Sequence, residues 1–139
     1  MPDCLFCKIV KKEIPAFLVH EDAATLGFLD VHPRAPGHIL VIPKAHRADI
    51  IELETSEVGP LFLAVRKLVR AAATALAADG FTIGVNHGAV SGQEVSHLHV
   101  HIMPRFAGDG GGSVQSVVGH PSEEPLASIR ERIVQSIHD

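Results

Sequence analysis

The stretch that decides the fold is Ser96-His97-Leu98-His99-Val100-His101-Ile102-Met103. In an extended strand, side chains two residues apart lie on the same face of the sheet. The three histidines are therefore expected on one face, with Leu98, Val100 and Ile102 on the other. The apolar face can enter a core, whereas packing alone gives no reason for three imidazoles in a row. The histidine face is thus the first candidate for a functional site.

Length and composition indicate one globular domain, residues 1–139. Of the 139 residues, 46% are hydrophobic and 20% charged, which allows a core and is untypical of disorder. A net charge of −4 argues against a nucleic-acid partner, which needs a basic surface. No apolar run is long enough to span a membrane, and the first residues lack the pattern of a signal peptide. We expect a cytoplasmic protein with no membrane partner.

The predicted elements follow one another as expected for an α+β fold, with helices packed on one face of the sheet. Strands are predicted at 17–21, 25–30, 38–42, 81–86 and in the histidine stretch. Helices are predicted at 4–12, at 56–78 and at 122–137. In the last of these, four residues are spaced for one apolar face: Leu126, Ile129, Ile133 and Ile137. The segment 38–42 is a continuous apolar run, which is typical of a strand buried on both faces.

The histidine face permits two kinds of chemistry. In the first, a neutral imidazole attacks phosphorus while its neighbours donate hydrogen bonds to phosphate oxygens. In the second, the histidines hold a catalytic metal. A solvated strand face without function is the remaining alternative.

The two cysteines form a separate motif. Cys4-Leu5-Phe6-Cys7 has the spacing of a zinc half-site, which needs two further ligands to complete a tetrahedron. Two unliganded thiols are also compatible with this spacing.

The segment 86–101, Asn-His-Gly-Ala-Val-Ser-Gly-Gln-Glu-Val-Ser-His-Leu-His-Val-His, resembles the signature of the histidine triad (HIT) hydrolases. Segment 28–46 is similar to the other long signature of that family, and segment 5–15 to its N-terminal part. The resemblance covers about residues 4–106, leaves 107–139 as a C-terminal loop and helix, and is strongest to the bacterial Hint-like branch. It implies a HIT-like fold with an antiparallel five-stranded sheet, one long and one C-terminal helix, and a homodimer with a shared ten-stranded sheet.

The resemblance also implies roles for individual residues. His99 matches the nucleophile that takes up a nucleotidyl group, flanked by His97 and His101, with His38 as a fourth active-site histidine. Nucleotide-binding positions are Asp30 for the ribose, Asn86, Gln93 and Glu94 around the α-phosphate and leaving group, and Leu5, Phe6, Ile9, Phe28 and Val31 around the base. The zinc ligands are Cys4, Cys7, His46 and His97, in a structural site whose four positions the protein fills.

The implied activity is hydrolysis or transfer at purine nucleoside 5′-phosphoramidates or related nucleoside monophosphate conjugates, of AMP or GMP type, through a nucleotidyl-His99 intermediate. The alternatives are dinucleoside polyphosphate hydrolysis, at a phosphoanhydride bond, and a nucleotide- or zinc-binding regulatory protein with little catalysis. No redox cofactor is expected. Two physical requirements agree with the first assignment. A nucleophilic histidine must be neutral, with its second nitrogen held by an acceptor such as a backbone carbonyl, and a carboxylate such as Asp30 can accept from two ribose hydroxyls. Glu94 agrees less well, because a carboxylate close to a phosphate repels it.

Overall fold

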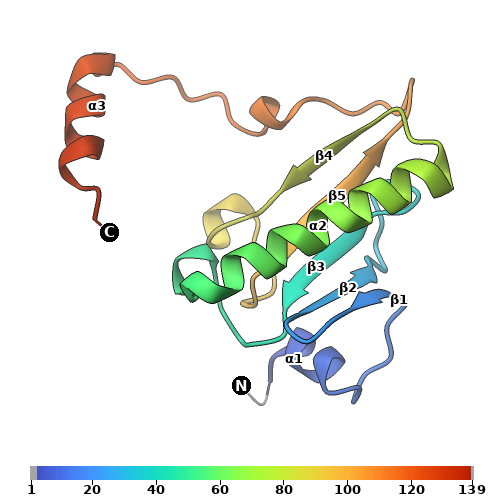
Figure 1. Ribbon diagram of the computed structural model, residues 1–139. Helices are drawn as coiled ribbons and strands as arrows, with labels where there is room; N and C mark the ends of the chain where they lie inside the picture. The colour runs from blue at the N-terminus through green and yellow to red at the C-terminus, as the bar shows by residue number, and fades with distance from the viewer. Residues whose placement is uncertain (1–2, 139) are drawn as a thin grey trace.

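The computed structural model describes residues 3–138, which form one antiparallel five-stranded sheet with helices (Figure 1). The strand order is β1-β2-β3-β5-β4. The strands are β1 Leu18–Glu21, β2 Thr25–Leu29, β3 Ile39–Pro43, β4 Gly80–Gly84 and β5 Val100–Arg105. The helices are α1 Leu5–Val10, α2 Thr55–Leu76 and α3 Leu126–Gln135, with short 3-10 turns at Ile50–Glu52, Ala89–Ser91 and Val114–Val117. The predicted α+β class is confirmed.

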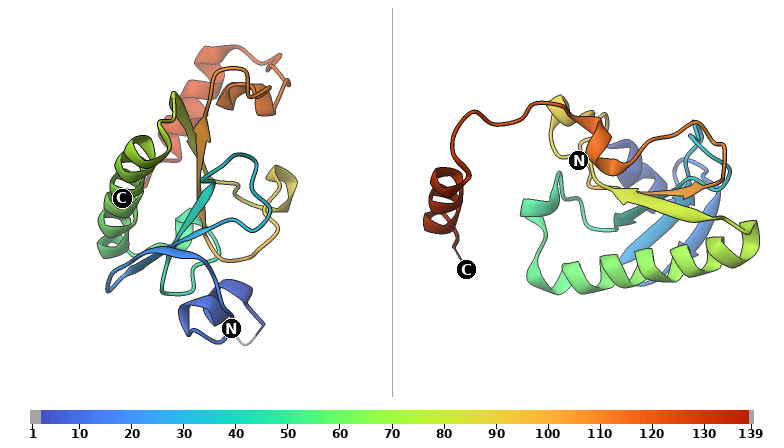
Figure 2. Two further views of the ribbon diagram at one scale, coloured as in Figure 1. Left: turned by 90° about the vertical axis from the view of Figure 1, so that its right-hand side faces the viewer. Right: turned by 90° about the horizontal axis from the view of Figure 1, so that it is seen from above.

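The long helix α2 covers one face of the sheet (Figure 2). Its buried side chains, among them Leu61 and Leu68, pack against Val41, Val100 and Ile102 of the two central strands. A capping box between Glu54 and Glu57 starts the helix, and Ala77 in the left-handed conformation ends it two residues short of the predicted end.

The short helix α1 packs on the opposite face of the sheet, so the prediction that all helices share one face is wrong. Phe6 and Ile9 of α1 form a second core with Leu40 and Ile42 of β3, while Val41 of the same strand points to the α2 core. Because successive strand residues alternate between faces, the continuous apolar run of β3 needs a cover on each side. The predicted burial of β3 on both faces is confirmed.

The histidine stretch is only partly a strand, because β5 begins at Val100. His97 and His99 lie in the segment that leads into it, where the Leu98 amide donates to the Arg47 carbonyl at 2.6 Å. The predicted alternation nevertheless holds, with Leu98 in the α2 core. His97 is 0% exposed and His99 8% exposed, so the histidines do not form a solvated face.

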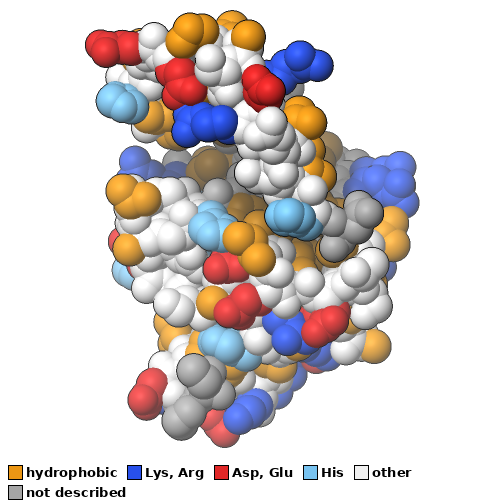
Figure 3. All heavy atoms as spheres, turned by 90° about the vertical axis from the view of Figure 1, so that its left-hand side faces the viewer, with side chains coloured by type: hydrophobic (Ala, Val, Ile, Leu, Met, Phe, Trp, Pro, Cys, Tyr) orange, Lys and Arg blue, Asp and Glu red, His pale blue; other side chains and the backbone are white. Residues whose placement is uncertain are grey.

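The helix α3 stands apart from the sheet, at the end of an extended segment (Figure 1). It begins at Leu126, later than predicted, because Pro125 occupies its N-cap. Leu126, Ile133 and Ile137, three of the four residues of the predicted apolar face, are exposed, and hydrophobic side chains are visible on this end of the molecule (Figure 3). No helix in the described range 3–138 has the length and apolar character needed to cross a membrane.

Candidate functional site

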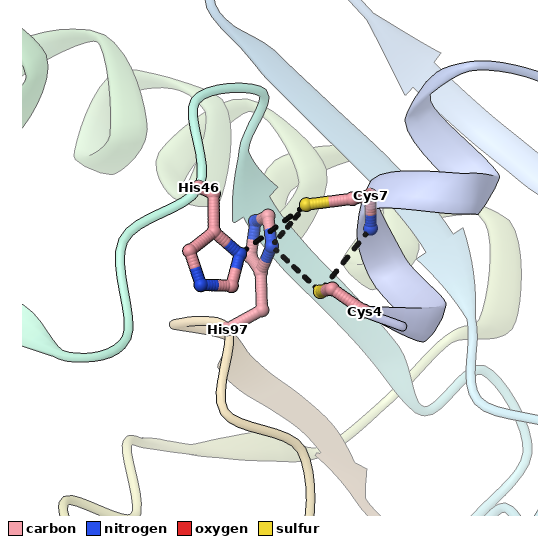
Figure 4. Close-up of side chains that lie close together, drawn as sticks. All are labelled: Cys4, Cys7, His46 and His97. Carbon is pink, nitrogen blue, oxygen red and sulfur yellow. Dashed lines mark hydrogen bonds between the residues drawn. The ribbon is translucent and has the colours of Figure 1, made fainter. Parts of the chain in front are cut away.

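The four predicted zinc ligands meet between α1, the loop after β3 and the segment before β5 (Figure 4). Their donor atoms all lie within 4.8 Å of one another. Nδ1 of His97 is 3.4 Å from Sγ of Cys4 and 3.5 Å from Sγ of Cys7. Nδ1 of His46 is 3.2 Å from Sγ of Cys7. Residues separated by up to 93 positions in the sequence thus form one compact donor cluster.

The cluster fits a tetrahedral zinc ion. With Zn–S near 2.3 Å and Zn–N near 2.1 Å, the sulfur and nitrogen ligands of a tetrahedral site lie about 3.6 Å apart, close to the distances found here. Nε2 of His97 donates to the Pro43 carbonyl at 2.8 Å, which leaves Nδ1 unprotonated and directed at the sulfurs, as a metal ligand requires. Burial and the neighbouring Cys4 raise the pKa of the Cys7 thiol, and a bound cation would lower it by stabilising the thiolate.

A second group of side chains joins β3 to β5. The Arg34 amide donates to Nδ1 of His38 at 3.1 Å, so neutral His38 carries its proton on Nε2. That nitrogen lies 2.9 Å from Nδ1 of His101, which must then accept the proton. Neutral His101 therefore carries its own proton on Nε2, a buried atom with no hydrogen-bond partner in the described chain. A chain of fixed tautomers thus ends in one unused N–H group.

Burial keeps both of these imidazoles neutral. Desolvation lowers the pKa of His101 to about 4 and also lowers the pKa of His38, which the nearby Asp30 carboxylate only partly offsets. Oδ2 of Asp30 is 3.7 Å from Nε2 of His38. Asp30, His38 and His101 are close enough to hold a cation, but the proton shared by the two rings already accounts for their approach.

His99 lies between these two groups. Its Nδ1 is 2.8 Å from the His97 carbonyl, and because a carbonyl only accepts, Nδ1 carries the proton and Nε2 the lone pair. The ring packs 5.0 Å from the ring of His101 and edge-on to Phe6 at 5.1 Å, measured between centroids. An imidazole held in this tautomer has the unprotonated nitrogen that nucleophilic attack requires.

The predicted base-binding residues lie on the α1 side of the sheet. Phe6, Ile9 and Phe28 belong to the second core, and the rings of Phe6 and Phe28 meet edge to face at 5.4 Å. Leu5 and Val31 are exposed, at 45% and 68%. The structure therefore brings Phe6 into contact with His99. It leaves the apolar side chains of Leu5 and Val31, which are close in sequence to Phe6 and Phe28, exposed to solvent.

The three residues predicted to face the phosphate are arranged differently from one another. The Gln93 side chain accepts from the Gly88 amide and donates to the carbonyls of Ala48 and Val95, so it holds the loop that precedes the histidines. Asn86 is half-buried, and Glu94 is exposed. Glu94 lines a pocket of 390 Å³ beside the cysteine cluster, together with Asp3, Cys4, Leu5, His46, Val95 and Ser96.

Sequence reasoning missed the main-chain groups that position the imidazoles. The carbonyls of Pro43 and His97 and the amide of Arg34 each fix one ring. Residue identity carries no signal for such groups. The only signal is the pair Pro33 and Pro36 on either side of Arg34, which indicates a loop whose backbone can approach a side chain.

Known proteins with similar sequences cover most of the chain. The sequence model of the HIT domain matches residues 11–108. An uncharacterised HIT-like protein of Methanocaldococcus jannaschii is 47% identical over 107 residues, covering 77% of this chain and 82% of that protein. An adenosine 5′-monophosphoramidase of Schizosaccharomyces pombe is 38% identical over 102 residues, covering 73% of this chain and 74% of that protein. An adenylylsulfatase of Arabidopsis thaliana is 40% identical, with 74% of this chain and 52% of that protein covered.

Solved structures show the same fold. A HIT family member from Bacillus subtilis superposes with a TM-score of 0.88 at 35% identity, covering 99% of both chains. A zinc-bound histidine triad family protein from Mycobacterium smegmatis gives a TM-score of 0.74 at 33% identity, covering 96% of this chain and 95% of that one. The chain belongs to the HIT family.

Proposed function

We propose that the protein is a nucleotidyl hydrolase or transferase that cleaves purine nucleoside 5′-phosphoramidates, or related nucleoside monophosphate conjugates, through a nucleotidyl-His99 intermediate. The observation that carries this proposal is the hydrogen bond from Nδ1 of His99 to the His97 carbonyl, which places the lone pair of the uncharged ring on Nε2. The names of the two relatives that act on adenylyl compounds support the substrate class. A cytoplasmic location agrees with the two free cysteines.

In the first step, Nε2 of His99 attacks phosphorus and the bond from phosphorus to the leaving group breaks. The proton on Nδ1 stays on that nitrogen, and its hydrogen bond to the His97 carbonyl stabilises the imidazolium that forms. The unused N–H of His101 donates a hydrogen bond to the reacting phosphate, and the departing amine or oxygen takes its proton from solvent. In the second step, water attacks phosphorus, its proton passes to solvent, and the bond from phosphorus to His99 breaks. His99 then regains its starting state.

The nucleotide is held by the residues that the family signature assigns. Asp30 receives the ribose hydroxyls, and Leu5, Phe6, Ile9, Phe28 and Val31 form the base site. Asn86 and Glu94 stand near the phosphate and leaving group. Gln93 contributes indirectly, because its side-chain amide holds the loop that precedes the histidines.

Cys4, Cys7, His46 and His97 are proposed to hold a structural zinc ion. The donor distances and the second hydrogen bond of His97 support this assignment. When bound, the ion supplies a cross-link between α1 and the sheet rather than a reactive water, because the protein fills all four positions.

A homodimer is proposed as the working form, with the two five-stranded sheets joined at their β4 edges. The last turns of α2 and the two residues after it form a run of alanines from Ala71 to Ala78, broken only by Thr74 and Leu76. This run is largely exposed and offers a second contact. The apolar run of β3 does not serve as a contact between the two copies, because it lies in the core of a single chain.

Mass spectrometry of the denatured protein after mixing with adenosine phosphoramidate tests the proposal. Wild type is expected to carry an adenylyl group or to release AMP, and His99→Ala to do neither. His87→Ala, which changes an exposed histidine, is the matched control and should behave as wild type. A wild type that binds AMP but neither reacts nor labels would instead support the regulatory binding protein. Reaction with a dinucleoside polyphosphate alone would favour phosphoanhydride hydrolysis.

A further inference from the structure

We propose that the metal cluster controls the nucleotide site: a metal bound by Cys4, Cys7, His46 and His97 raises the affinity for nucleotide, and nucleotide raises the affinity for metal. The inference rests on the proposed function, because it takes the surroundings of Phe6 and His99 as the place where nucleotide binds. Two connections between the sites carry it.

The first connection is α1, which supplies groups to both sites. Cys4 is its N-cap and Cys7 lies in its first turn, and both face the metal cluster. Phe6 and Ile9, from the same six residues, pack into the core on the nucleotide side. A helix of one and a half turns does not persist without tertiary contacts. Whatever fixes Cys4 and Cys7 therefore also fixes the ring of Phe6.

The second connection is His97, whose three polar groups have three partners. Nδ1 points to the sulfurs, Nε2 donates to the Pro43 carbonyl, and the main-chain carbonyl accepts from Nδ1 of His99. A metal at Nδ1 fixes the ring and, through the residue's own backbone, the carbonyl that sets the tautomer of His99. The Phe6 ring closes the arrangement, 6.0 Å from the His97 ring and 5.1 Å from the His99 ring.

Thermodynamic linkage makes the effect reciprocal, so both affinities must change by the same factor. We expect metal removal to weaken AMP binding at least tenfold, because α1 and the His97–His99 segment then lose the cross-link that holds them. Saturating AMP is expected to lower the dissociation constant of zinc by the same factor.

Calorimetry of AMP binding to the zinc-loaded and the chelator-stripped protein measures the first factor. Zinc competition against a chromophoric chelator, with and without AMP, measures the second. Hydrogen exchange of the stripped protein should increase at 5–10 and 97–99 and remain slow in β2, β3 and α2. Faster exchange throughout the chain would overturn the proposal, since the metal would then hold the whole fold rather than these two segments.

Two variants test the metal ligands and the Phe6 ring separately. In wild type, Sγ of Cys4 accepts a hydrogen bond from the Cys7 amide at 3.4 Å, and the hydroxyl of Cys4→Ser can also accept it. The substitution weakens the metal site, so this variant should bind AMP as weakly as the stripped protein does. Phe6→Leu leaves all four ligands in place and should bind zinc normally without nucleotide, with the coupling factor reduced toward one. Equal AMP affinity in the loaded and stripped wild type would refute the coupling alone. Failure of AMP to bind either form would refute the proposed function instead.

Discussion

The three histidines from His97 to His101 share one face of the chain, yet each ring is held in a different way. His97 donates from Nε2 to Pro43, His99 donates from Nδ1 to the His97 carbonyl, and His101 accepts at Nδ1 from His38. The alternating sequence predicted the shared face. The chemistry of a nucleophilic histidine predicted that its second nitrogen needs an acceptor. It could not identify the acceptor, because the position of a carbonyl depends on the fold and not on the residue that bears it.

The buried ring of His101 makes stability depend on pH. Its pKa is lowered to about 4, whereas a histidine in the unfolded chain titrates near 6.5. Between these pH values the unfolded chain binds a proton that the folded chain does not. The contribution of neutral His101 to the stability of the fold is therefore fully present above about pH 6.5 and is lost as the pH drops toward 4. In wild type, this effect is expected to lower the free energy of unfolding by about 3 kcal/mol between pH 7 and pH 4. In His101→Asn, this contribution should be absent.

Urea unfolding at several pH values, in the presence of a chelator so that zinc release does not contribute, measures this effect. The free energy of unfolding of His101→Asn should fall less steeply with acid than that of wild type. His120→Asn, in the exposed C-terminal segment, serves as control and should keep the wild-type slope. Equal slopes for wild type and His101→Asn would contradict the burial argument.

Asp30 is expected to recognise the ribose through its charge. Oδ1 already accepts from the His32 amide at 2.9 Å, and Asp30→Asn retains an oxygen for that bond while removing the charge. AMP affinity should fall by about 10- to 100-fold, the size expected for hydrogen bonds to a charged group. Affinity for 2′,3′-dideoxy-AMP should change little. Titration of both nucleotides into both proteins decides the matter, and an equal loss for both ligands would show that Asp30 acts on the fold.

At the scale of elements, the sequence predicted five strands and three helices and was wrong about one placement. The apolar run of β3 already required a cover on both faces, which conflicts with the prediction of all helices on one face. The position of α1 on the second face resolves the conflict. The periodicity of α3 was confirmed in part, but a pattern shows only that a face is apolar and not what it contacts. Its exposed leucine and isoleucines therefore could not be placed from sequence.

The loop between β2 and β3 depends on Gly37, which has a φ of +83° and would place a Cβ 2.2 Å from Cδ1 of Leu76. Gly37→Ala should therefore destabilise the fold by about 1–3 kcal/mol through backbone strain and, because it precedes His38, reduce turnover as well. Leu76→Ala in addition should relieve the contact but not the strain. Thermal unfolding checks this, with Gly59→Ala as control, since a Cβ there meets nothing within 4 Å. A stable Gly37→Ala protein with wild-type turnover would contradict the argument.

At the scale of the whole molecule, the two edges of the sheet differ in their protection. The register of β1 shifts between Leu18 and His20, and Glu21 at its end is paired with Lys12 and Lys44. Irregular pairing and charges are features that keep an edge strand from pairing with another chain. By contrast, β4 pairs regularly with β5 over all five residues and carries no charged side chain. This contrast, which sequence could not show because it depends on strand order, favours β4 as the edge that joins two copies.

The edge assignment predicts different outcomes for two similar substitutions. Ile83 of β4 is 41% exposed and Val19 of β1 is 44% exposed, so a lysine at either position costs a single chain about equally little. If the β4 edges form the shared sheet, Ile83→Lys places two like charges at the junction and disrupts it. Sedimentation velocity should then find a dimer for wild type and Val19→Lys and a monomer for Ile83→Lys. The opposite pattern would place the junction at β1, where the bulge and the ion pairs of Glu21 would have to be rearranged, and a monomeric wild type would exclude the shared sheet altogether.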